Sequence, residues 1–142
     1  PSKIDRAEKK EFHKILKNMC NRHNKNYYKK YKKWCDEYFY LPHRKEPRGI
    51  GGIFFDYKKN NFDKDFKFVR DVGITFQLIF NKIITKKIKK KWTIKDKELQ
   101  YFKRGRYTEF NLLYDRGTKF GLQTGGNVEG ILMSLPPLAK WE

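Results

Sequence analysis

Cysteine is scarce in this sequence and long apolar runs are absent, and each of these features excludes a class of protein. The two cysteines, Cys20 and Cys35, cannot build a disulfide framework, and they do not form a CxxC pair. A reducing compartment is therefore the simpler expectation. No stretch approaches the roughly 18 consecutive apolar residues of a membrane-spanning helix, and no signal-peptide pattern opens the chain.

Acidic residues are also few, since 16 Asp and Glu stand against 34 Lys and Arg and leave a net charge of +18 over 142 residues. Such a charge makes nucleic acid the first class of partner to consider. An aromatic content of 17% argues against a disordered chain, because these side chains bury much apolar area. The length is that of one domain. Because the first residue is Pro1 and not Met, we expect a fragment or a processed chain.

The lysines and arginines occur in different settings. Lysines form short runs such as Lys29-Lys30 and Lys32-Lys33, which are typical of a solvated face. A guanidinium binds a carboxylate or phosphate through two parallel hydrogen bonds, whereas an ammonium acts as a point charge. We therefore expect a specific anionic ligand at the arginines that stand beside Gly or His in loop-like contexts, namely Arg44, Arg48, Arg104, Arg106 and Arg116.

Apolar periodicity predicts helices over the first two thirds of the chain. The expected ranges are 5–23, about 27–37, 62–92 and about 95–103, the last ended by Gly105. Pro42 prevents continuation of the second helix. Gly73 lies within the apolar stripe of the third helix, where it indicates either tight packing against a neighbour or simple tolerance of glycine.

Strands are expected in two places. The apolar, β-prone run 53–55 predicts a buried strand after the Gly-rich segment 49–52. Segments 107–114, 118–122 and 128–134 predict an antiparallel meander with turns at 115–117 and 124–127. Helices followed by an antiparallel ribbon predict an α+β layer fold.

The chemical motifs are weak when they are taken alone. His13, His23 and His43 do not have zinc-site spacing; His13 is most simply a satisfied helix-edge residue, whereas His43 adjoins Arg44 and could line a site. The Gly49-x-Gly51-Gly52 segment precedes a strand and is not a dinucleotide fingerprint. The candidate acid/base carboxylates are Asp56, Asp115 and Glu109. Asp115 is most simply a turn residue, and Glu109, like Glu129, most simply belongs to a buried or cross-strand salt bridge. The residues alone thus predict a basic α+β domain with an anion pocket rich in Arg and Gly.

Three blocks, in the same order, resemble the oxygen-dependent coproporphyrinogen III oxidase family. The first spans 33–56 and contains His43-Arg44-x-x-x-Arg48-Gly49-x-Gly51-Gly52. The second spans 104–122, and the third continues through Thr124-Gly125-Gly126 and 131–136 to Trp141-Glu142. The resemblance covers nearly the whole chain, so residues 1–142 are interpreted as the C-terminal part of a single domain of this family.

The resemblance implies a fold and a reaction. The fold is a large, flat antiparallel sheet with helices on both faces, in a homodimer with contacts through about 107–142. The reaction is the oxidative decarboxylation by O2 of two propionates of coproporphyrinogen III to vinyl groups in haem biosynthesis, giving protoporphyrinogen IX, CO2 and hydrogen peroxide. O2 is the co-substrate and no cofactor is expected; His13 and His43 match positions proposed as metal ligands in bacterial members. The expected compartment is the cytoplasm, with the mitochondrial intermembrane space as the alternative.

The resemblance also implies roles for particular residues. Arg44 and Arg48 match family arginines implicated in gripping a propionate, and Asn127 stands where the family often has Arg. The presumed general-acid His segment and Gly-rich Asp segment of the family are upstream, so no catalytic residue is expected here and the chain alone is predicted to be inactive. The alternatives are a charge-driven nucleic-acid-binding module and a non-catalytic dimerisation remnant. The predicted substrate-binding set is His43, Arg44, Arg48, Gly125, Gly126 and Asn127.

Overall fold

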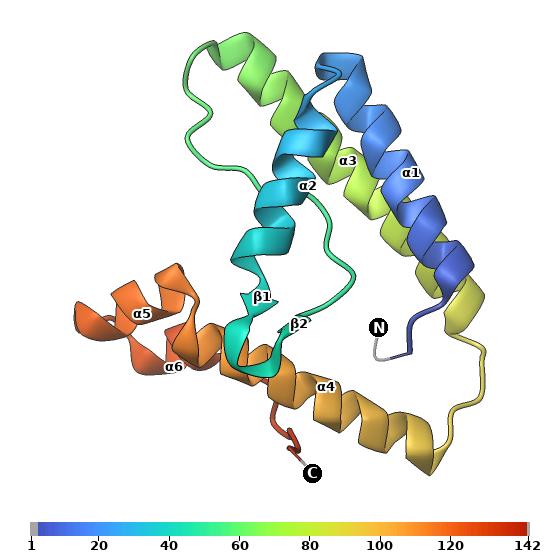
Figure 1. Ribbon diagram of the computed structural model, residues 1–142, viewed down its shortest axis with the longest axis vertical. Helices are drawn as coiled ribbons and strands as arrows, with labels where there is room; N and C mark the ends of the chain where they lie inside the picture. The colour runs from blue at the N-terminus through green and yellow to red at the C-terminus, as the bar shows by residue number, and fades with distance from the viewer. Residues whose placement is uncertain (1–2, 142) are drawn as a thin grey trace. The chain divides into compact units, whose positions relative to one another are not determined.

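The computed structural model describes residues 3–141 and shows a mostly helical chain with one small sheet (Figure 1). By contact the chain divides into two compact units, Ile4–Lys91 and Trp92–Glu142 together with Pro1–Lys3, and each is described by itself. None of the helices in residues 3–141 combines the length and the apolar character needed to cross a membrane. The elements are α1 (Arg6–His23), α2 (Tyr27–Tyr38), β1 (Tyr40–Leu41), the 3-10 turn η1 (Pro42–Arg44), β2 (Glu46–Pro47), α3 (Phe62–Lys87), α4 (Ile94–Leu113), α5 (Arg116–Gln123) and α6 (Val128–Leu132).

Helices α1, α2 and α3 form the first unit around a core rich in aromatic and aliphatic side chains. The buried side chains come from all three helices, as the apolar periodicity predicts. The expectations for 5–23 and about 27–37 are confirmed; the third helix begins at 62 as predicted but ends at Lys87, before the predicted 92. Burying each large apolar side chain stabilises the unit by about 1.5–3 kcal/mol. The core cluster consists of Leu16, Met19, Cys20, Tyr31, Phe68 and Ile79.

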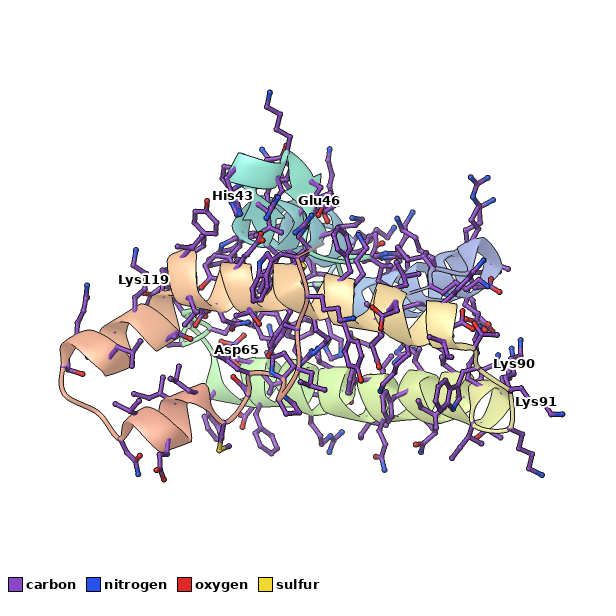
Figure 2. The ribbon with its side chains drawn as sticks, turned by 90° about the horizontal axis from the view of Figure 1, so that it is seen from below. His43, Glu46, Asp65, Lys90, Lys91 and Lys119 are labelled. Atoms are coloured by element: carbon purple, nitrogen blue, oxygen red, sulfur yellow. The ribbon has the colours of Figure 1, made fainter. Side chains whose placement is uncertain are left out.

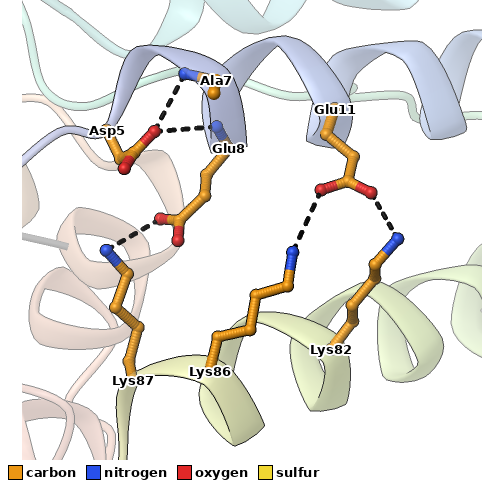
Figure 3. A network of polar contacts seen from close by, with 7 residues as sticks. All are labelled: Asp5, Ala7, Glu8, Glu11, Lys82, Lys86 and Lys87. Carbon is orange, nitrogen blue, oxygen red and sulfur yellow. Dashed lines mark hydrogen bonds and ion pairs between the residues drawn. The ribbon is translucent and has the colours of Figure 1, made fainter. Parts of the chain in front are cut away.

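Ion pairs fix how α1 lies along α3 (Figure 3). Near the start of α1, Glu11 pairs with Lys82 and, at 3.7 Å, with Lys86, while Glu8 pairs with Lys87 at 3.1 Å. At the other end of α1, His23 Nε2 lies 2.9 Å from the Asp71 carboxylate. The two helices are therefore antiparallel. Because the pairs of Glu11 are largely exposed and therefore contribute little, they help to select the register of the two helices, while the core supplies most of the stability.

Lys58 links the loop between β2 and α3 to the core cluster of the first unit through polar contacts. Its ammonium lies 2.9 Å from Asp65 Oδ1, and it donates to the hydroxyls of Tyr27 at 3.1 Å and Tyr31 at 3.4 Å. Burial opposes the charge, but these hydrogen bonds outweigh it and raise the pKa of Lys58. The ammonium also lies 5.2 Å from the centroid of the Phe68 ring. The loop is thus held by polar and cation–π contacts without a strand partner.

The prediction of a buried strand over 53–55 is wrong. The segment is half-buried and its backbone is not part of a sheet; the Phe54 N–H donates to the Tyr31 carbonyl at 3.1 Å. Its Ile53 and Phe55 side chains pack on the core cluster. The apolar composition of 53–55 therefore predicts its burial correctly. The segment is not a strand, because no neighbouring strand of the described chain is available to form backbone hydrogen bonds with it.

The predicted meander over 107–134 is also wrong, because these residues form the end of α4 and all of α5 and α6. Asp115 accepts a hydrogen bond from the Thr118 N–H at 2.8 Å, and Asn127 accepts one from the Gly130 N–H at 3.2 Å. The two residues that suggested tight turns are thus helix N-caps. A capped helix satisfies its backbone groups locally, whereas each strand of a meander needs a partner.

Helix α4 does not end at Gly105 as predicted. Thr93 and Asp96 form a capping box at its start, and the helix continues to Leu113. At Gly105 the backbone of Lys140 instead packs closely against α4, and a Cβ at this position would clash with the Lys140 carbonyl oxygen. The Lys140 N–H donates to the Tyr101 carbonyl at 3.1 Å, so the segment after α6 packs along α4.

The sheet of the described chain is a two-stranded antiparallel hairpin with Tyr40 opposite Pro47 and Leu41 opposite Glu46. The fold prediction therefore holds in its coarse form, helices together with an antiparallel sheet. The flat sheet with helices on both faces, which the resemblance implies, stays a prediction. The predicted dimer segment 107–142 ends at Glu142, which lies outside the described residues.

Candidate functional site

His43 lies at the tip of the β1–β2 hairpin (Figure 2), and Arg44 follows it in the same turn. Both residues belong to η1 and are exposed, and the turn closes at Lys45 in the left-handed conformation, φ 51°. Leu41, at the end of β1, is fully buried. The hairpin thus carries a histidine and an arginine next to each other on a short turn.

Arg48 directly follows this hairpin and lies on an aromatic platform. Its guanidinium carbon is 4.2 Å from the centroid of the Phe39 ring, and its backbone N–H donates to the Phe39 carbonyl at 2.9 Å. Phe54 packs edge-on against Phe39 and stacks on Tyr38 at 4.7 Å. Arginine stacks on aromatic faces through its planar guanidinium, and the same planar group can bind a carboxylate through two parallel hydrogen bonds.

The Gly-rich segment after Arg48 is held tightly against α1 and α2. Gly51 has φ +73°, and a Cβ there would lie 2.7 Å from Asp36 Oδ1. The Asp36 carboxylate in turn accepts from the Lys32 ammonium at 2.8 and 2.6 Å. Only glycine meets both requirements, a left-handed backbone and close approach to a carboxylate that is already engaged.

His13 fixes the same segment from α1. Its Nε2 donates to the Ile50 carbonyl at 2.9 Å, which places the proton on Nε2 because a carbonyl only accepts. Its Nδ1 then accepts from the Tyr28 hydroxyl at 3.1 Å. Burial lowers the pKa of His13, although the bond to Ile50 opposes this shift. The interpretation of His13 as a satisfied helix-edge residue is confirmed.

Two grooves lie along α1 and α2 and are lined mainly by lysines. From the sequence we expected lysine runs such as Lys29-Lys30 and Lys32-Lys33 to form a solvated face. The volumes of the grooves are about 910 and 720 Å³, and both are lined by Lys17, Tyr28 and Lys32. Lys25, Lys29 and Lys33 follow one another every four residues, and this spacing was the available signal for a shared face. The remaining lining residues are Asp36, Glu37 and Tyr40 in the larger groove and Arg6, Lys9, Lys10, His13 and Lys14 in the smaller one.

Arg44 and Arg48 line neither of these grooves. In the other unit, Arg106 is buried and pairs with Glu109 at 3.2 Å, one turn further along α4. Arg104 lies over the ring of Tyr107 at 4.2 Å. The expected salt bridge of Glu109 is therefore present, but within a helix and not between strands. Arg106 has a structural role, and we no longer count it among the candidate anion ligands.

The predicted substrate-contacting turn joins α5 to α6. Gly125 has φ +71°, as a tight turn requires. The Gly126 N–H donates to the Gly121 carbonyl at 2.9 Å, and the Asn127 side chain caps α6. A Cβ at Gly126 would lie 3.0 Å from Ile131 Cδ1. The turn is thus closely packed, and the proposed contact of Gly125, Gly126 and Asn127 with a substrate stays a prediction.

Metal-ligating side chains do not gather in the part of the chain that the structure describes, since residues 3–141 contain no group of three or more His, Cys, Asp and Glu able to hold an ion. The suggested ligands His13 and His43, and the expectation that no cofactor is needed, are not tested by this geometry.

Comparison with known proteins assigns the chain to a class of enzymes. The sequence profile of the family described as coproporphyrinogen III oxidase matches residues 1–142. A curated oxygen-dependent coproporphyrinogen-III oxidase from Rickettsia rickettsii (strain Sheila Smith) is 56% identical over 138 residues, which are 96% of this chain and 50% of the relative. One from Rickettsia bellii (strain OSU 85-389) is 57% identical over 135 residues, 94% of this chain and 48% of the relative.

The chain belongs to the coproporphyrinogen III oxidase family, which confirms the resemblance seen in its three motif blocks. It spans about half the length of the curated relatives it matches, and it corresponds to their C-terminal half.

The histidine at the Gly-rich segment gives the fold a pH dependence that can be measured. Because folding lowers the pKa of His13 below its ordinary value near 6.5, the unfolded chain binds more protons below that pH. The free energy of unfolding is therefore not reduced by His13 above about pH 6.5, and it decreases as the pH falls from there toward the pKa of His13 in the folded state. We expect urea unfolding between pH 7 and 5 to show a smaller loss of unfolding free energy for His13→Gln than for the wild type. Equal losses in the two proteins would contradict this assignment.

Proposed function

We propose that this chain is the substrate-gripping half of an oxygen-dependent coproporphyrinogen III oxidase. The observation that carries the proposal is an identity of 56% over 96% of the chain to a relative of that name. At each of two propionates, O2 would accept two electrons and two protons while CO2 leaves, so that one propionate and one O2 give one vinyl group, one CO2 and one H2O2. The product would be protoporphyrinogen IX.

The proposed roles of the residues follow from the charge of the substrate. Coproporphyrinogen III carries four carboxylates on an electron-rich tetrapyrrole, so its site needs several cationic donors. Arg48 on its aromatic platform and Arg44 at the hairpin tip are the proposed carboxylate ligands, with His43 beside them. The substrate's own pyrrole would reduce O2, and the protein would hold one propionate so that its β-hydrogen reaches the peroxide formed.

The finer architecture is proposed together with this function. The β1–β2 hairpin would be the local part of a larger flat antiparallel sheet with helices on both faces, and a homodimer would form through about 107–142. O2 would be the co-substrate and no metal would be required. Support for these statements comes from the family resemblance of the three motif blocks.

Activity should require the other half of the family domain. We expect the 142-residue chain alone to give no turnover of coproporphyrinogen III in air-saturated buffer. The same chain joined in one polypeptide to the N-terminal half of the Rickettsia rickettsii relative should form protoporphyrinogen IX, followed as porphyrin fluorescence after oxidation. Turnover by the chain alone would refute the requirement, and a folded but inactive joined protein would instead support the non-catalytic remnant.

The carboxylate grip is tested in the same joined protein. We expect Arg48→Ala to raise KM about tenfold or more with kcat changed less than about threefold, because a charge-assisted hydrogen bond contributes roughly 1.5–3 kcal/mol. Arg22→Ala, at an exposed position that lines neither groove, is the matched control and should keep both constants. If Arg48→Ala leaves both KM and kcat unchanged, Arg48 is not a ligand of the substrate.

The lysine-lined grooves on α1 and α2 support a second candidate function, charge-driven binding of nucleic acid. Titration with single- and double-stranded nucleic acid at two salt concentrations separates the two functions. A steep salt dependence together with a preference for one strand form would favour the nucleic-acid module. Weak binding without preference is what a merely basic surface gives.

A further inference from the structure

One side of α3 carries a continuous apolar stripe that the core of its own unit does not use. Six large apolar side chains on this side have exposed fractions between 39% and 79%: Phe62, Phe66, Val69, Phe76, Phe80 and Ile84. Their spacing of three, four or seven residues places them on one face of the helix. The core is contacted instead through a different face, which carries Phe68, Thr75 and Ile79.

The α3 stripe is long and contains no charged side chain. From Phe62 to Ile84 it extends for about 33 Å at a rise of 1.5 Å per residue. Its rings already associate in pairs, since Phe62 stacks on Phe66 and Phe76 on Phe80, each pair with centroids 5.9 Å apart. An exposed apolar surface of this extent marks an interaction site in a chain as highly charged as this one.

Gly73 forms a notch in the middle of the α3 stripe. A Cβ built at this position meets no atom within 4 Å, so no neighbour in the described structure explains the glycine. Glycine in a helix interior is about 1 kcal/mol less favourable than alanine. The sequence alone left two interpretations open, tight packing or tolerance. An empty notch flanked by Val69 and Phe76 fits tight packing against a surface outside the unit Ile4–Lys91.

We propose that the α3 stripe is the docking surface for the N-terminal half of the family domain. The curated relatives contain, besides the region that matches this chain, a further half of similar length. The lysine-lined grooves are unsuited to an apolar partner, whereas the α3 stripe presents no charge. The partner surface is therefore apolar, about 33 Å long, and places a bulky side chain over Gly73. This inference rests on family membership and not on the proposed reaction.

Thiol labelling measures the burial of the stripe directly. Val69→Cys lies on the stripe, and Leu78→Cys is its matched control, an exposed apolar position on another side of α3. The native cysteines provide a low background, because both are buried and burial raises the pKa of Cys20 to about 11. Each variant is labelled with a maleimide in two forms, this chain alone and the chain joined to the N-terminal half of the Rickettsia rickettsii relative.

We expect the two introduced cysteines to react at similar rates in the chain alone. In the joined protein, Val69→Cys should react at least tenfold more slowly, while Leu78→Cys keeps its rate. Equal labelling of Val69→Cys in both forms overturns the proposal, and so does protection in the chain alone that grows with concentration, which would assign the α3 stripe to a second copy. Circular dichroism confirms that each variant is folded. The readout does not depend on turnover, so the docking proposal and the proposed function fail independently.

Discussion

The packing around the ring of Phe68 organises the unit that contains the hairpin and its arginines. This ring is 1% exposed and lies between groups from α1, α2 and the loop before α3. Its centroid is 5.3 Å from that of His23 on α1, 5.0 Å from Tyr27 on α2 and 5.0 Å from Phe55 in the loop. A single aromatic side chain of α3 therefore holds two helices and the loop that follows the Gly-rich segment.

The position of Arg48 depends on this packing through a short series of contacts. Phe55 lies against Phe68, and the neighbouring Phe54 bonds through its N–H to Tyr31 and packs its ring against Phe39. Phe39 is the ring on which the Arg48 guanidinium lies. Tyr28 and His13 add a second support by holding the Ile50 carbonyl. Arg48, the proposed carboxylate ligand, is thus held in place by packed aromatic rings, although the hairpin itself is short.

Sequence reasoning succeeded where one local signal dominated. The 3.6-residue periodicity located α1, α2 and α3 because their apolar faces meet in a single core. It failed at Asp115 and Asn127, because an Asp or Asn before a short polar stretch is compatible with either a turn or an N-cap. Gly105 misled for a similar reason, since its role is close approach to Lys140 and not helix termination.

The candidate functional site was likewise predicted from the sequence only in part. The motif around Arg44 and Arg48 identified the family, which the comparisons confirm. The lysines that meet in the grooves of α1 and α2 were not expected to do so, because the pairing of two helices depends on long-range packing that no local pattern records. Gly73 was ambiguous for the same reason, since no contact within its own unit accounts for a glycine at this position.

Amide hydrogen exchange in Phe68→Leu tests the dependence of the Arg48 segment on the core. This substitution costs about 1–1.5 kcal/mol in a packed core, so we expect the Phe54 N–H to exchange roughly five- to tenfold faster, together with the amides of α3. Phe110→Leu, at the equally buried ring of the other unit, should leave the Phe54 rate unchanged. Faster exchange in α3 with an unchanged Phe54 rate would contradict the dependence of the Arg48 segment on Phe68.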